Sequence, residues 1–154
     1  MEYLAGLHEK VTHFPIAFLA VYPIIELIAV LSKKEFFGKA AFLFLFIGVI
    51  GALMAVLTGN QAFTINDDWS KESLRIFNQH EINANITIWL FTALLIFRYF
   101  LSVKRKLSNL LHILILLTAL TGLYFIYQTG NYGGELVKSK YRNSIIEEKT
   151  SDSL

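Results

Sequence analysis

The chain has 154 residues, of which 55% are hydrophobic and only 17% are charged, and its formal net charge is +2. A soluble domain has about a quarter charged residues, so this composition indicates a membrane protein, and the small net charge argues against a nucleic-acid partner. The absence of cysteine excludes disulfides, thiolate metal sites, iron–sulfur clusters and covalently attached haem.

Four apolar segments have about the length of 20 residues that a helix needs to cross a membrane. They lie at about residues 14–31, 36–58, 82–101 and 107–127. An isolated strand cannot satisfy its backbone groups in lipid, so we predict an all-α four-helix transmembrane bundle with both termini on the same side. Residues 1–137 would form this domain, and the polar residues 138–154 would form a flexible tail.

The connections between these segments differ in length and charge. The first and third are short and contain Lys33-Lys34 and Lys104-Arg105-Lys106, which the positive-inside rule assigns to the cytoplasm. The second, residues 59–80, is longer and is expected to contain a short interfacial helix, with Trp69 at the headgroup level. These features predict a multi-pass membrane protein whose second loop and termini face outward, which is the periplasm if the membrane is a bacterial inner membrane.

The two halves of the chain begin and end alike. His8-Glu9 precedes the first apolar segment, and His80-Glu81 precedes the third, 72 residues later. Thr58-Gly59-Asn60 ends the second segment, and Thr129-Gly130-Asn131 ends the fourth, 71 residues later. We interpret this pattern as two pseudo-symmetric helical hairpins, related by a two-fold axis along the membrane normal.

Three histidines meet at the outer end of the predicted bundle, because His8 and His13 precede the first span and His80 precedes the third. Imidazoles from two helices at one depth commonly hold b-type haem. His80 belongs to every pairing of ligands. Its partner is His8 by symmetry or His13 by depth, and His13 is narrowly favoured because it stands closer to the apolar interior.

Other residues near these histidines fit more than one role. Glu9, Glu81 and Asn85 are candidates for partners that orient the imidazoles. The three histidines with Glu81 could instead bind a zinc or copper ion. They could also bind nothing, since histidine at a membrane interface can keep its polar edge in water.

A second group of ionisable residues lies within the apolar segments of the cytoplasmic half. Glu26 and His112 could pair to neutralise each other, relay a proton or bind a quinone headgroup, but a structural hydrogen bond between two helices is the favoured interpretation. Arg98 is expected to extend to the inner membrane surface. Gly48 and Gly51 should give the second helix a face for close packing.

The chain also resembles a known bacterial membrane-protein family, domain of unknown function 2231, over about residues 8–140. The resemblance rests on His8-x4-His13-Phe-Pro-Ile-Ala, the Thr-Gly end of the hairpin, His80-x4-Asn85, and Gly133-Gly134-Glu-Leu-Val137. It implies a four-helix integral membrane domain in a haem or electron-transfer context, because some members are joined to cytochrome c-type domains. Members often continue into Tyr-x-His-Gly, whereas this chain has Lys138-Ser-Lys-Tyr141, so any ligand role falls on His8, His13 and His80.

These observations predict a membrane protein that holds one haem b and passes electrons between a quinol or neighbouring redox subunit and an external cytochrome c or copper protein. An accessory subunit is favoured over an enzyme, because no nucleophile stands with a base. The alternatives are a non-redox structural or assembly subunit, and a membrane protein that binds a transition metal through its histidines. Lipid is a partner in each case, and the chain could form an oligomer.

Overall fold

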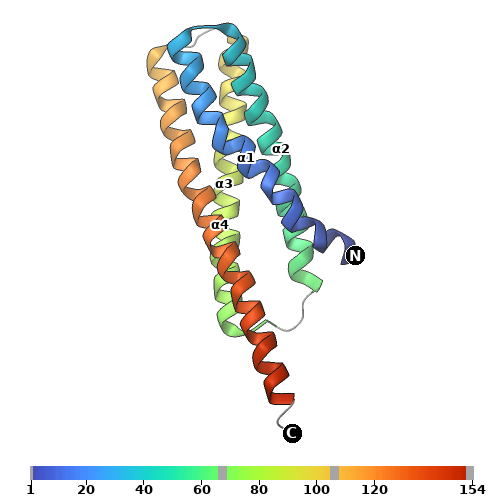
Figure 1. Ribbon diagram of the computed structural model, residues 1–154. Helices are drawn as coiled ribbons and strands as arrows, with labels where there is room; N and C mark the ends of the chain where they lie inside the picture. The colour runs from blue at the N-terminus through green and yellow to red at the C-terminus, as the bar shows by residue number, and fades with distance from the viewer. Residues whose placement is uncertain (1, 66–68, 105–107, 152–154) are drawn as a thin grey trace.

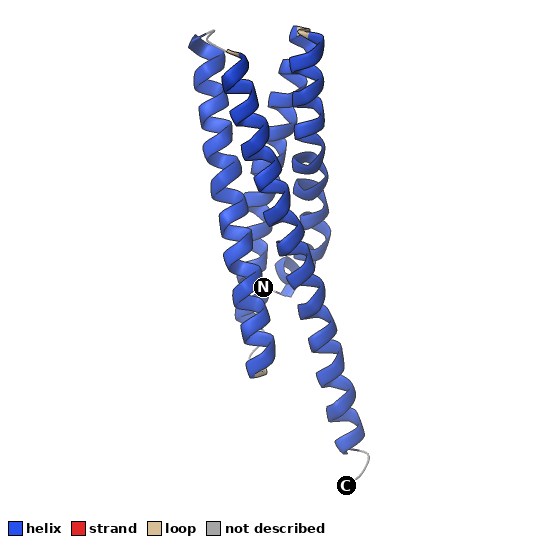
Figure 2. Cartoon of the chain, turned by 90° about the vertical axis from the view of Figure 1, so that its left-hand side faces the viewer, coloured by secondary structure: helices blue, strands red, loops and turns tan. Residues whose placement is uncertain are grey.

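The computed structural model describes residues 2–65, 69–104 and 108–151. Four helices account for nearly all of them: α1 (Glu2–Ser32), α2 (Glu35–Ile65), α3 (Lys71–Lys104) and α4 (Asn109–Ser151). They run up and down in an elongated bundle (Figure 1), and the described residues contain no strand (Figure 2). The predicted all-α, four-helix architecture is therefore confirmed.

All four helices are long and apolar enough to cross a membrane. The candidate spans are Leu7–Ser32, Glu35–Thr64, Lys71–Ser102 and Leu110–Ser139. Large apolar side chains such as Leu31, Trp89 and Tyr127 are about 70% exposed on the bundle. Such exposure would be costly in water but is favourable in hydrocarbon.

The bundle consists of two hairpins, because α1 packs mainly on α2 and α3 packs mainly on α4. Contacts of α2 with α3 and of α1 with α4 are fewer, and α1 and α3 lie diagonally opposite. The first hairpin turns at Lys33, whose positive φ of 54° and hydrogen bond to the Ala29 carbonyl (3.0 Å) end α1 in a left-handed cap. We call the end with both hairpin turns the turn end, and the opposite end the histidine end.

The helices extend beyond the apolar segments that predicted them. Residues 59–65 continue α2, and residues 71–80 form the first turns of α3. For the described residues, the prediction of a separate interfacial helix in this loop is therefore wrong. Ser70 caps α3 by accepting a hydrogen bond from the Ser73 amide (3.1 Å). α4 likewise runs without a break through residue 137 to Ser151. Apolar runs mark lipid contact, whereas caps mark where a helix begins and ends.

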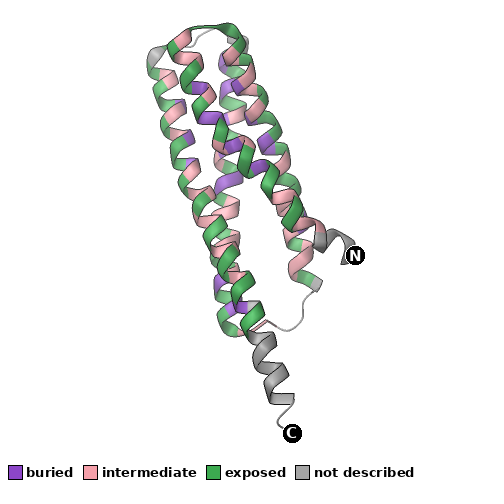
Figure 3. Cartoon of the chain, in the orientation of Figure 1, coloured by how far each residue is buried: buried purple, intermediate pink, exposed green. Residues whose placement is uncertain are grey.

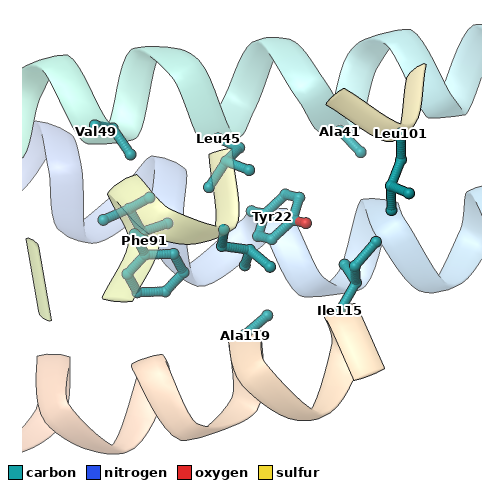
Figure 4. Packing of buried hydrophobic residues seen from close by; sticks show 10 residues of the cluster. Tyr22, Ala41, Leu45, Val49, Phe91, Leu101, Ile115 and Ala119 are labelled. Atoms are coloured by element: carbon teal, nitrogen blue, oxygen red, sulfur yellow. The ribbon is translucent and has the colours of Figure 1, made fainter. Parts of the chain in front are cut away.

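The apolar core lies toward the turn end. Its ten fully packed residues come from all four helices and include Leu19, Tyr22, Leu45 and Phe91 (Figure 4). Toward the histidine end, buried residues are sparser and the hairpins stand farther apart (Figures 1 and 3). The fully buried apolar core therefore joins the hairpins toward the turn end, whereas ring contacts such as Phe63–Phe77 join them toward the histidine end.

Glycines allow the closest helix contacts within each hairpin. A methyl group on Gly48 would lie 2.5 Å from the Leu19 side chain, and one on Gly51 would lie 3.2 Å from the Pro15 ring. The predicted packing face of α2 is therefore confirmed. In the second hairpin, a methyl group on Gly122 would lie 2.5 Å from the ring of Phe91, which the repeat relates to Leu19. Glycine thus allows close helix packing in both hairpins.

Candidate functional site

His8 and His80 face each other across the axis of the bundle. Their ring centroids are 6.5 Å apart, and the ring planes are nearly perpendicular, at 87°. The two residues belong to α1 and α3, whose backbones are not neighbours, so the side chains alone bridge the gap. Both residues are half-buried. The repeat inferred from the sequence therefore corresponds to a spatial pair.

The ring of His80 is held by the backbone of α4. Its Nδ1 lies 2.9 Å from the carbonyl oxygen of Thr129. A carbonyl oxygen only accepts hydrogen bonds, so Nδ1 must carry the proton in this contact. The lone pair of a neutral His80 is then on Nε2, the atom that is free to bind a ligand.

The ring of His8 is held in the same way by α2. Its Nδ1 lies 3.2 Å from Oγ1 of Thr58. The Thr58 hydroxyl donates to the carbonyls of Met54 (2.9 Å) and Ala55 (3.0 Å), so its oxygen is left to accept from Nδ1 of His8. Both imidazoles therefore have Nδ1 anchored on the second helix of their own hairpin, with the lone pair on Nε2.

Glycine lets each ring lie against its neighbouring helix. A methyl group on Gly59 would lie 2.9 Å from Cε1 of His8, and one on Gly133 would lie 3.4 Å from the His80 ring. A larger side chain at residue 59 would displace the imidazole. Gly59 and Gly133 were visible in the sequence, but their relation to the histidines was not.

The other residues predicted near this pair lie outside it. His13 and Glu9 are on the exposed face of α1, and Glu81 and Asn85 are only partly buried on α3. Within the described part of the chain, the two imidazoles are hydrogen-bonded to Thr58, Thr129 and the backbone of Ala55, and not to Glu9 or Glu81. Sequence reasoning missed these two threonines, although their repeat was the available signal.

A second cluster lies toward the turn end, where Glu26 is fully buried on α1. Nη1 of Arg98 donates to Oε1 of Glu26, and Nδ1 of His112 lies 3.3 Å from the same oxygen. Nη2 of Arg98 also donates to the carbonyl of Gly38 (3.1 Å), so residues from all four helices meet here.

The prediction that Arg98 extends to the membrane surface is wrong, because its side chain is only 4% exposed. A buried guanidinium is tolerated when a carboxylate and further hydrogen bonds replace its hydration. Glu26 supplies that carboxylate from the position that the 72-residue repeat relates to Arg98. The pair thus crosses the same axis as the two histidines, five helical turns farther along.

Comparison with known proteins agrees with this architecture. Among curated proteins and solved structures, none matches the chain. The family described as predicted membrane protein (DUF2231) matches residues 5–142, which include all four apolar helices and both clusters. The chain therefore belongs to this family of predicted membrane proteins.

Proposed function

We propose that this protein is an integral membrane cytochrome of the b type, in which His8 and His80 would hold one haem. It would serve as an electron-transfer subunit of a larger redox complex. The observation that carries the proposal is the symmetric His8–His80 pair, in which each Nδ1 is anchored and neither Nε2 is hydrogen-bonded to the described residues. An Nδ1 hydrogen bond to a backbone or side-chain acceptor is the usual support of a metal-bound histidine.

The spacing of the two rings favours ligands on opposite sides of one iron. With metal–nitrogen bonds of about 2 Å and a ring nitrogen about 1.1 Å from its ring centre, opposed imidazoles have centroids about 6.2 Å apart. A tetrahedral ion would bring the centroids to about 5 Å. The observed 6.5 Å is close to the first value.

A bare zinc or copper ion is supported less well. Structural zinc sites use four protein ligands, and catalytic sites use three. The described residues contain no group of three or more His, Cys, Asp or Glu side chains that could hold an ion. The two histidines alone suit a cofactor that brings its own equatorial ligands, as a porphyrin does.

A haem held by His8 and His80 would supply one-electron transfer to this protein. The protein's contribution would be to fix the two imidazoles and to surround the group with an apolar bundle. The basic residues at the turn end support a cytoplasmic location for that end by the positive-inside rule. The His8–His80 pair would then lie near the periplasmic face of a bacterial inner membrane, within reach of an external cytochrome c or copper protein.

The test is a reduced-minus-oxidised absorption spectrum of the detergent-purified protein, with a pyridine haemochrome assay for stoichiometry. We expect a b-type α band and one haem per chain. The band should disappear in His8→Ala and in His80→Ala, whereas His13→Ala, on the exposed face of α1, is the matched control and should keep it. A colourless protein from haem-replete cells, or a band that survives His8→Ala and disappears in His13→Ala, would refute the proposed site.

A further inference from the structure

The cluster around Glu26 contains three buried polar atoms without a hydrogen-bond partner in the described part of the chain. They are Oη of Tyr22, Oε2 of Glu26 and Nε of Arg98. Tyr22 and Glu26 are completely buried, and Arg98 is 3% exposed. Tyr22 also lies within electrostatic range of both charged residues. Polar atoms this deeply buried are almost always hydrogen-bonded, to protein or to ordered water.

The three atoms complement each other. Nε of Arg98 can only donate, Oε2 of the ionised Glu26 can only accept, and the Tyr22 hydroxyl can do both. The remaining polar atoms of the ion pair are already used, because Nη1 binds Oε1 and Nη2 binds the Gly38 carbonyl. None of the three atoms is hydrogen-bonded directly to another, because each of them lacks a partner among the described residues.

One water molecule can satisfy all three. The water oxygen accepts a hydrogen bond from Nε of Arg98, and one water hydrogen is donated to Oε2 of Glu26. The second hydrogen or second lone pair of the water bonds to the Tyr22 hydroxyl. A buried water typically makes about three hydrogen bonds of this kind. Figure 4 shows the Tyr22 side chain inside the bundle, with its hydroxyl directed toward the side on which Ala41, Leu101 and Ile115 lie. Glu26 lies one turn farther along the same helix.

We propose that a water molecule is bound between Tyr22, Glu26 and Arg98 inside the membrane-spanning bundle, and that His112 is its route of exchange with the outside. His112 bonds to Glu26 from α4, and its side chain is 19% exposed, whereas those of Glu26 and Arg98 are at most 4% exposed. Since His112 also lies in the first turn of α4, at the turn end of the bundle, it is the member of the cluster through which water and protons would reach the carboxylate. This site is separate from the His8–His80 pair and does not depend on the proposed haem.

The sign of a stability change tests whether the Tyr22 hydroxyl has a partner. Tyr22→Phe removes only that hydroxyl. If the hydroxyl binds the water, the melting temperature of the purified protein falls by several degrees; if the hydroxyl is unpaired, its removal raises the melting temperature. Tyr127→Phe, at an exposed position on α4, is the control and should leave the melting temperature unchanged. A rise in Tyr22→Phe would overturn the proposal.

A direct Tyr22–Glu26 bond would also lower the melting temperature of Tyr22→Phe, so a second measurement detects the water itself. In ¹⁵N-arginine-labelled protein in nanodiscs, the Nε–H resonance of Arg98, assigned by its loss in Arg98→Lys, should show a magnetisation transfer from a long-lived water. Absence of this transfer would overturn the bound water. In His112→Phe, exchange of that proton with solvent should slow at least tenfold, and an unchanged rate would overturn the exchange route.

Discussion

The buried pair of Glu26 and Arg98 gives the sharpest test of how the two hairpins are joined. Arg98→Met would leave the Glu26 carboxylate without its guanidinium partner in a site that is 0% exposed. Breaking a buried ion pair from one side costs about 3–5 kcal/mol, because an uncompensated charge remains. At about 2–4 °C per kcal/mol for a chain of this size, the melting temperature should fall by about 6–20 °C.

The matched variants separate the charge effect from the packing effect. Glu26→Leu with Arg98→Met removes both charges and should lose much less stability than Arg98→Met alone, since apolar replacements of a buried pair are often nearly neutral. Lys39→Met, which breaks an exposed pair with Glu35 on α2, should change the unfolding free energy by less than about 1 kcal/mol.

The assay is thermal unfolding in detergent, followed by circular dichroism, with a double-mutant cycle over residues 26 and 98. The cycle should give a coupling free energy of at least about 3 kcal/mol between the two residues, because each single variant leaves an unpaired buried charge that the double variant removes. If Arg98→Met were as stable as the wild type, or if the double variant cost the sum of the single variants, the two residues would not stabilise each other as a buried ion pair.

Two further predictions concern local packing and helix capping. Gly122→Ala should lower the unfolding free energy by about 1–3 kcal/mol, because its methyl group would press on the fully buried ring of Phe91. Gly130→Ala on the same helix meets no neighbour within 4 Å and should raise the unfolding free energy by about 0.5–1 kcal/mol. Equal effects of the two substitutions in the same assay would contradict this reasoning. Ser70→Ala should cost about 1 kcal/mol by removing the cap of α3, while Ser70→Gly should cost only a few tenths, and urea unfolding in mild detergent distinguishes the two.

The four helices and their pairing could be predicted from the sequence because both leave a local signal. A run of about 20 apolar residues has one stable form in lipid, which is a helix. The hairpin repeat was visible because identical short sequences recur at its two ends, as in Thr58-Gly59 and Thr129-Gly130. Those identities also predicted that His8 and His80 face each other, which the ring contact bears out.

The helix ends could not be predicted from the apolar runs alone. The first ten residues of α3 are largely polar, with Lys71, Glu72 and Arg75 among them, so hydropathy assigns them to a loop. Two other features of the sequence indicate a helix there, namely the capping serine at residue 70 and the apolar positions of Ile76 and Phe77. Phe77 stacks on Phe63 of α2 with ring centroids 3.9 Å apart, and this contact joins the two helices outside the apolar segments.

Glu26 was not predicted as the partner of Arg98, because the repeat was recognised only from identical residues. In the structure, equivalent positions of the two hairpins share their burial even where the residue types differ. Positions 19 and 91, 22 and 94, and 26 and 98 are all 72 apart, and all six residues are buried.

Two-fold symmetry brings equivalent positions face to face across the axis. Two neutral histidines can occupy such a pair of equivalent positions, since both imidazoles can bind one ligand that lies between them. Two glutamates or two arginines could not, because like charges at that depth repel without water to screen them. A charged residue on the axis of a duplicated membrane hairpin is therefore expected to face its opposite, so Glu26 predicts a basic residue at position 98.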